Sequence, residues 1–285
     1  MFIEDMHNGI MPFNRLQQGQ HQFSVHLDPD RDEIEAIIAE ALNGHRYDLT
    51  EALCDFIREA TQSLFFYGKI AYEIVYETDA EGNIIKFNLE SIYPLSIVKF
   101  LDCYLQVIPW WVARSSRVKA GIRKIPKEKM LYVEFPEKLG GRKEIKKILK
   151  RLAALGKELL PEFQMKAMKE NRSIGFDLNE YTKEKYLEKA QITKQLGWNQ
   201  RKIPDGQILE YYSLYRRLNF SLSQAIVREH LLEAINATIN GPLLNLETKI
   251  VMNGISSSKQ IETEFKTLQA GNLKFEDLFK RTMIL

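Results

Sequence analysis

The hydrophobic period of this chain changes near residue 70, and that change constrains the fold more than any other feature. Before it, apolar residues recur at helical spacing over residues 34–42 and 53–64. After it, a β-branched and aromatic run at 71–77 is followed by turn-forming residues at 79–83 and a second extended run at 84–89. The sequence therefore predicts an α+β chain in which a helical N-terminal part leads into a β-hairpin.

Two helices are predicted before the hairpin. The first 27 residues, with scattered glycines and a glutamine-rich stretch, indicate an irregular arm with little power to form a core. Asp28-Pro29-Asp30 then resembles a helix start, with Asp28 as the cap and Pro29 in the first turn, and Asn43-Gly44 ends that helix. The second helix begins at Asp48 or Thr50, packs on the first, and stops at Gly68.

Short extended segments continue to about residue 136. Strands are predicted at 92–100, 104–108, 110–113 and 129–135, the last of them after a turn at Ile125-Pro126. Gly140-Gly141 is interpreted as a hinge. A helix then runs from Arg142 towards Asn171, with a kink or a break at Pro161.

The C-terminal half is predicted to be mainly helical. Its segments are an extended piece at 173–178, a helix at 182–196, a loop at 197–206, a strand at 208–215, a long helix at 221–240 that stops at Gly241-Pro242, and a helix at 259–268. These boundaries divide the chain into an irregular arm (1–27), a helix pair with a β-rich module (28–136), a long-helix region (137–255) and a C-terminal helical tail (256–285).

Charge is strongly segregated along a chain of ordinary globular composition. Of 285 residues, 45% are hydrophobic and 27% charged, which allows a sizeable core. The formal net charge is only +2, yet residues 1–100 hold 7 lysines and arginines against 17 acids, and residues 114–151 hold 14 against 4. Such polarity can steer a polyanion to one face, or let the acidic part of one subunit meet the basic part of another. A solvated surface without a partner is the third interpretation.

Several classes of protein are disfavoured. The N-terminus lacks a basic segment followed by an apolar stretch, and the apolar runs are far shorter than the roughly 20 residues of a bilayer span. We therefore expect a soluble chain with no membrane partner. Cys54 and Cys103 lie far apart among apolar neighbours, which predicts buried, reduced thiols rather than a zinc site.

The sequence has no recognisable catalytic centre. It contains no G-x-x-x-x-G-K-[ST], G-x-G-x-x-G or G-x-S-x-G motif. The acidic run 28–33 lacks the glycine and spacing of a calcium loop. His230, with Glu229 and Glu233 nearby on the same helix, could hold a proton relay or half of a metal site, but a half-buried helical histidine is the favoured interpretation. We expect no enzyme, no cofactor and no metal.

Cations interleaved with aromatic residues are the remaining functional signal. Trp110-Trp111 followed by Arg114 and Arg117 combine stacking platforms with charge, which suits contact with a nucleic-acid backbone. The alternative is a hairpin whose tryptophans fill a core or a subunit contact. The run 211–217 admits the same two interpretations, with a core strand favoured.

A second basic group lies on the helix after Gly140-Gly141. Its apolar positions form a narrow stripe, and its cations face elsewhere. These candidate nucleic-acid or subunit contacts are Lys143, Lys146, Lys147, Lys150 and Arg151. The glycine pair before this helix also resembles an anion site at a helix N-terminus, although a hinge is favoured.

The order of segments resembles that of the portal proteins of tailed bacteriophages. Residues 68–76 with 82–84 and 92–95 are similar to a strand, a glycine-containing turn and an "I-x-P" segment of that family. Residues 125–133 are similar to its "I-P-x-x-x-V-L-H" strand, with Tyr132 where a histidine is common, and 139–142 resemble the glycine turn that opens its long helix. The likeness spans about residues 50–155 and is looser beyond. The chain is short for the family and lacks a long C-terminal helical crown.

The resemblance implies a portal-like subunit, wing-like over 28–136 and stem- or clip-like over 137–255. It further implies a ring of identical copies, commonly twelve, at a capsid vertex of the virion, assembled in the host cytoplasm. Double-stranded DNA would pass through the ring, and terminase, capsid and connector proteins would dock on it. Oppositely charged segments suit the head-to-tail contacts of a closed ring. The alternatives are a nucleic-acid-binding module that forms no ring, and an enzyme with a site of dispersed residues, such as His230 facing Glu73 or Asp177.

Overall fold

A computed structural model describes residues 1–12, 23–44, 48–81, 84–116, 119–157, 178–198, 200 and 207–272; for 115–116, 178–181 and 207–213 it describes the backbone only. The helices of these parts are α1 (Phe2–Ile10), α2 (Asp32–Leu42), α3 (Leu49–Tyr67), α4 (Trp110–Ser116), α5 (Gly141–Lys157), α7 (Leu178–Ile192), α8 (Gln207–Ile239) and α9 (Ser258–Gln269). The strands are β1 (Ser24–Asp28), β2 (Lys69–Thr78), β3 (Ile84–Ser91), β4 (Ile97–Phe100), β5 (Cys103–Ile108), β6 (Gly121–Pro126), β7 (Met130–Glu134) and β8 (Lys249–Asn253). The α+β class expected from the sequence is confirmed.

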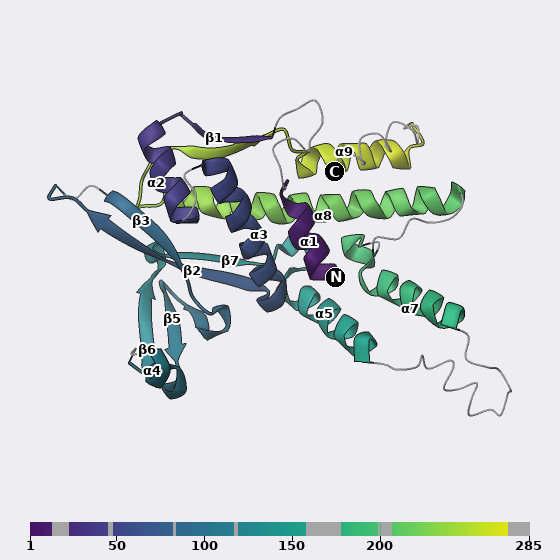
Figure 1. Cartoon of the computed structure of the whole chain (residues 1–285), viewed down its shortest axis with the longest axis horizontal. Helices are drawn as coiled ribbons and strands as arrows, with labels where there is room; N and C mark the ends of the chain where they lie inside the picture. Colours follow the sequence, from purple (N-terminus) through teal and green to yellow (C-terminus); the bar gives the residue numbers. More distant parts are fainter. Residues whose placement is uncertain are drawn as a thin grey trace.

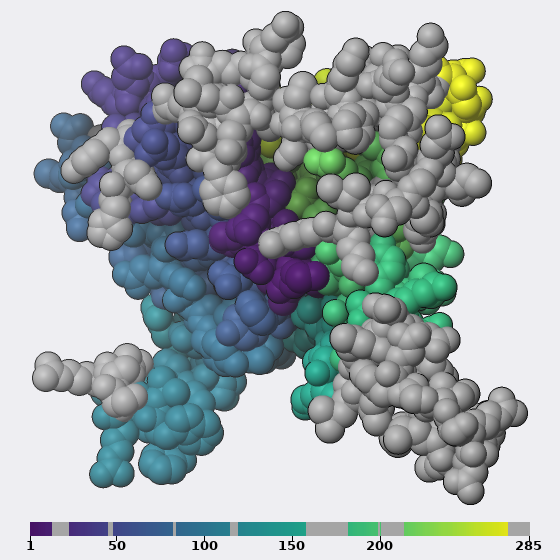
Figure 2. Space-filling model, turned by 45° about the vertical axis from the view of Figure 1, so that its right-hand side comes forward, coloured from purple at the N-terminus to yellow at the C-terminus, as the bar shows by residue number. Residues whose placement is uncertain are grey.

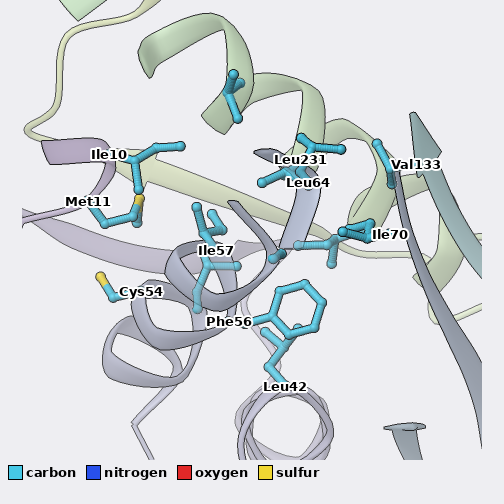
Figure 3. Close-up of a cluster of buried hydrophobic side chains, with 14 of the residues drawn as sticks. Ile10, Met11, Leu42, Cys54, Phe56, Ile57, Leu64, Ile70, Val133 and Leu231 are labelled. Atoms are coloured by element: carbon cyan, nitrogen blue, oxygen red, sulfur yellow. The ribbon is translucent and has the colours of Figure 1, made fainter. Parts of the chain in front are cut away.

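The main core lies between helices α1, α3 and α8 and the sheet that follows α3. Figure 1 shows α8 running along the length of the molecule, with α1 and α3 beside it. In Figure 3, Leu64 of α3 lies beside Leu231 of α8, and Phe56 points towards Leu42 of α2. One continuous cluster of buried apolar side chains joins elements from α1 to β8, so both ends of the described chain contribute to a single core.

Three antiparallel sheets are present in the described residues. The first has the order β3-β2-β7, with β2 in the centre, and the second has the order β4-β5-β6. The third is the pair β1-β8, which joins residues more than 200 positions apart, with Val25 opposite Met252. The hairpin predicted from the period change is β2-β3, and the strands predicted at 104–108 and 129–135 are β5 and β7, so these predictions are confirmed.

Helix α3 shows how local signals set an element. The Asp48 side chain accepts hydrogen bonds from the backbone N–H groups of Thr50 (2.8 Å) and Glu51 (3.3 Å), which would otherwise lack partners. At the other end Gly68 adopts a left-handed conformation (φ 72°), and its N–H bonds to Leu64 O. Strand β2 begins at the next residue. The sequence predicted both ends of this helix correctly.

The predicted N-terminal arm and first helix start were wrong in their details. Residues 2–10 form α1, because Phe2, Met6 and Ile10 recur at helical spacing and are buried. Residues 24–28 form β1 rather than part of an arm, and Asp28 ends that strand instead of capping a helix. Helix α2 starts only at Asp32. Pairing with β8 decides the conformation of β1, and no local signal encodes that pairing.

Four further predictions need correction. Residues 110–113 are helical (α4), not a strand, and residues 208–215 belong to the first turns of α8, so the run 211–217 is not a core strand. Residues 92–100 form a strand only from Ile97, after the 3₁₀ turn η1 (Pro94–Ser96). Residues 121–126 form β6, in which Ile125-Pro126 ends a strand. The predictions at Pro161, at 173–177 and at 201–206 lie outside the described residues.

Candidate subunit and nucleic-acid interfaces

Helix α5 carries the basic group that the sequence predicted. Ile145, Ile148 and Leu155 are buried in the main core, in line with the predicted apolar stripe. All five candidate cations, Lys143, Lys146, Lys147, Lys150 and Arg151, are exposed on the remaining sides of the helix. One acid accompanies them: Lys147 Nζ lies 3.5 Å from Glu144 Oε2. The helix thus presents a strip of positive charge to solvent, which we call the α5 basic face.

The glycine pair before α5 has positive φ at both residues, 90° at Gly140 and 65° at Gly141. This left-handed backbone explains the choice of glycine. A Cβ added to Gly141 would lie 2.7 Å from Glu137 Oε1. A carboxylate therefore already lies against the start of the helix, which argues against the anion site considered for this position. The hinge at Gly140-Gly141 stays a prediction.

The second candidate surface is a unit that we call the small sheet, made of β4, β5 and β6 with α4 between β5 and β6. Figures 1 and 2 show it standing out from the body, at the lower left of both views, and Figure 1 shows α4 at its tip. Two contacts join it to the first sheet: Lys69 Nζ of β2 donates to Ile97 O (2.6 Å), and Arg123 of β6 forms an ion pair with Glu73 of β2. The rings of Tyr104 and Tyr132, 4.9 Å apart, fill the space between the sheets.

The two tryptophans lie at the tip of the small sheet. The side chain of Trp110 is 65% exposed and that of Trp111 61%, and their rings are edge-to-face with centroids 5.9 Å apart. They do not fill the core of the single chain, so a core position is the wrong interpretation, and a subunit contact stays a prediction. Arg114 is exposed on the same helix. Arg117, the remaining candidate of this group, lies outside the described residues.

The third candidate surface is acidic. Helix α2 lies on the β2-β3 hairpin, where Lys86 Nζ of β3 contacts Glu40 Oε1 of α2 at 2.5 Å. Beyond this pair, exposed carboxylates lie on the hairpin, at the start of α2 and just before it: Asp30, Asp32, Glu33, Glu77, Glu81 and Glu90. Partial burial and the nearby negative charges of Asp30 and Asp32 raise the pKa of Glu35, an effect that His26 partly opposes. We call α2 with this hairpin the acidic lobe (upper left in Figure 1).

Three of the titratable residues considered for catalysis, His230, Glu229 and Glu73, make structural contacts. The ring of His230 is half-buried, and its Nε2 lies 3.0 Å from Glu134 O, as the structural interpretation expected. Glu229 accepts hydrogen bonds from the N–H (2.6 Å) and hydroxyl of Ser258, which attach the start of α9 to α8. Glu73 faces Arg123 rather than His230. Asp177 lies outside the described residues.

Cys54 and Cys103 are both buried, and no disulfide joins them, as predicted. Among the described residues, no three His, Cys, Asp or Glu side chains are placed to hold a metal ion. None of the described helices is both long and apolar enough to cross a membrane. A shallow groove of about 620 Å³ lies between α1, α3 and α5, lined mainly by apolar side chains that include Phe2, Phe66 and Leu149.

Sequence reasoning missed three buried cations that hold elements together. Arg228 of α8 donates to Ile10 O (3.1 Å) and Ser256 O (2.5 Å), and burial lowers its pKa to about 10. Arg216 donates to Ala190 O (3.1 Å) and Trp198 O. Burial also lowers the pKa of Lys69, with a smaller contribution from Arg142. Their partners are mostly backbone carbonyls. Every residue has such a carbonyl, so the sequence does not indicate which of them a buried cation will bind.

Comparison with solved structures gives a loose likeness, whereas the comparisons of sequence find none. No protein-family model matches the chain, and no curated protein matches it. Among solved structures, the chain is similar to the crystal structure of an HK97 family phage portal protein from Corynebacterium diphtheriae. The TM-score is 0.41 and the identity 9%, over 88% of this chain and 92% of that one. At these values the likeness is a distant one of fold, and it assigns no role to any residue.

Proposed function

We propose that this chain is a portal-like structural protein, whose identical copies assemble into a ring that phage DNA traverses during packaging and ejection. The observation that carries the proposal is the separation of exposed charge into an acidic lobe and two basic surfaces, the α5 basic face and the small sheet. Because these surfaces differ, copies that pair acid with base meet head to tail, and a head-to-tail contact closes into a ring when its rotation allows.

The α5 basic face suits a DNA conduit better than a tight DNA-binding site. Five exposed cations along one helix attract the phosphate backbone without reading bases, so they impose no sequence preference. A channel must let its cargo slide, and contacts of this kind permit sliding along the duplex. The proposed setting is a capsid vertex, with terminase, capsid and connector proteins as further partners and about a dozen copies in the ring.

The test replaces three cations of α5 by alanine, at Lys146, Lys147 and Lys150. These side chains are exposed, so the triple variant should fold normally, with an unchanged unfolding temperature. We expect it to lose ring assembly in native mass measurements, or DNA passage in a packaging assay, by about tenfold or more. A matched control removes three exposed lysines elsewhere, Lys183, Lys194 and Lys259, and should behave as the wild type.

Two results would contradict the proposal. If the wild-type chain stays monomeric at high concentration, by native mass measurement and negative-stain imaging, there is no ring and the proposed function is wrong. If the ring forms and the α5 variant assembles and packages like the control, the basic face has no part in either process.

The second candidate is a nucleic-acid-binding module that forms no ring. The observation in its favour is the exposed tryptophan pair with Arg114 beside it, since aromatic faces and cations together bind unpaired bases. It predicts that dispersed single copies bind single-stranded DNA, with affinity that falls steeply as salt rises, and that Trp110→Ala with Trp111→Ala weakens this binding.

A further inference from the structure

The small sheet is apolar on both of its faces. Tyr104 and Ile125 are cross-strand neighbours on the inner face, where they pack with Met130 and Ile92 in a cluster of their own. The residues that alternate with them point outward and are far from buried: the exposed fractions are 52% for Val98, 54% for Phe100, 45% for Val107 and 71% for Ile122. Strands with apolar residues on both faces are typical of sheets that are covered on both sides.

The outer face is continuous, because the strand register aligns its members. Val98 of β4 is opposite Leu105 of β5, and Val107 of β5 is opposite Ile122 of β6. The exposed tryptophans of α4 follow directly at the end of β5, so they extend the apolar surface to the tip. Single exposed apolar residues are ordinary on a protein surface, but a continuous group of this kind marks a contact with another molecule.

Charge indicates what covers this face. Residues 97–129 hold 8 lysines and arginines against 2 acids, and Lys119, Lys124 and Lys127 are exposed around the apolar group. A second copy of the same face would bring positive charge against positive charge, which disfavours a symmetric dimer through it. The occupant must therefore be acidic and must also present apolar side chains.

The acidic lobe of a second copy has both properties. Helix α2 (residues 32–42) holds 4 acids and no lysine or arginine, and residues 73–90 hold 5 acids against 1 cation. The β2-β3 hairpin of the lobe exposes Val75 (41%) and Ile85 (55%) among its carboxylates. Within one chain the base of this hairpin contacts the small sheet, through Lys69 and through the ion pair of Glu73 with Arg123, while Glu77 and Glu81 lie further along towards the turn.

We infer that the outer face of the small sheet, with the Trp110–Trp111 tip, is the surface through which one copy of this chain binds the acidic lobe of the next. This inference rests on the proposed function, since it names the two surfaces by which the copies of a ring would meet. It assigns the tryptophans to a protein contact, and it leaves the α5 basic face free for DNA.

The test is a charge exchange between the two surfaces. One variant carries Lys119→Glu with Lys124→Glu, a second carries Glu77→Lys with Glu81→Lys, and a third carries all four changes. All four side chains are exposed, so each variant should fold, as circular dichroism and thermal unfolding can check. We expect each pair alone to lower the association constant at least tenfold in sedimentation velocity at low salt. The fourfold variant should recover most of it, because opposite charges face each other again.

A second pair of variants tests the apolar part. Val98→Asn with Ile122→Asn places polar groups at positions that are already exposed to solvent in a single copy. The unfolding temperature should therefore stay within a few degrees of the wild type, while assembly weakens. The matched control reverses exposed charges away from both surfaces, Glu188→Lys with Glu262→Lys, and should assemble normally.

Three results would overturn the inference, and they are distinguishable from a failure of the proposed function. If wild-type rings form and all the variants form them too, the copies meet through other surfaces, although the ring stands. If each pair blocks assembly and the fourfold variant does not restore it, the two surfaces do not face each other. If the lysine pair alters only the binding of a DNA duplex, the small sheet is a DNA contact. A monomeric wild type contradicts the ring itself.

Discussion

At Gly197 the absence of a side chain lets a turn lie directly against the long helix α8. Its φ is 74°, and a Cβ there would lie 2.5 Å from Phe220 N and 2.6 Å from Arg216 O, both on the backbone of α8. These backbone atoms cannot move aside to relieve a clash as easily as the end of a flexible side chain can. Arg216 completes the junction by bonding carbonyls at the end of α7 and at Trp198.

Gly197→Ala should therefore destabilise the chain by about 3 kcal/mol or more, since a steric clash adds to the left-handed backbone. Gly271→Ala is a matched control, because Gly271 has nearly the same φ of 72° but nothing within 4 Å of the added Cβ. That change should cost only about 1–2 kcal/mol, the price of the backbone conformation alone. Urea unfolding measures both values, and equal losses would mean that the turn moves away from α8 without cost.

Single residues also mark where sequence reasoning reached its limit. The exposure of the five α5 cations followed from their spacing, because helical periodicity alone separates them from the apolar stripe. The burial of Arg228 could not be predicted from the sequence in this way. It sits beside Glu229 in an ordinary charged stretch, and only the packing of α1 and α9 against α8 turns it into a bridge between two carbonyls.

At the scale of elements, the attachment of the small sheet to the body depends on few polar contacts. Arg123 is half exposed, but its partner Glu73 is nearly buried, with 12% of the side chain accessible. A carboxylate left there without its cation loses a charge-assisted pair and stays partly desolvated. The register places Lys124, the next residue, on the opposite face of β6, away from Glu73.

Arg123→Gln should loosen the small sheet without unfolding the molecule. We expect faster amide hydrogen exchange in β5 and β6, corresponding to a loss of about 1–3 kcal/mol of local stability, with exchange in α3 unchanged. Lys124→Gln is the matched control and should leave exchange in β5 and β6 as it is. Equal protection in both variants would show that apolar packing around Tyr104 and Ile125 alone holds the two sheets together.

Some helices and strands could be predicted from the sequence, and others could not. Helix α3 and the β2-β3 hairpin were predicted because their caps, turn and period are local. Strands β1 and β8 were not, since each is short and finds its partner over 200 residues away. The sequence of α4 predicts a strand because its aromatic and β-branched residues favour strands, but this preference is weak enough for the surrounding structure to override.

At the scale of the whole molecule, assembly through the acidic lobe and the small sheet predicts a dependence on salt. Raising the ionic strength from 0.1 to 1 M shortens the Debye length from about 10 to 3 Å, so attraction between exposed charges is largely screened. We expect the assembled fraction in sedimentation velocity to fall as NaCl rises over this range. An assembled fraction that stays constant up to 1 M would indicate that apolar contacts carry the association without help from charge.

The sequence by itself determined the α+β class, the segregation of charge and the outward-facing cations of α5, because these depend on composition and on the periods of helices and strands. The tertiary structure decided where the tryptophans lie, which strands pair across the chain, and that the base of the acidic hairpin contacts the basic sheet through the Glu73–Arg123 ion pair. The physical reason is distance along the chain. Caps, turns and hydrophobic periods act between neighbours, whereas surfaces and long-range pairs exist only once remote segments have packed together.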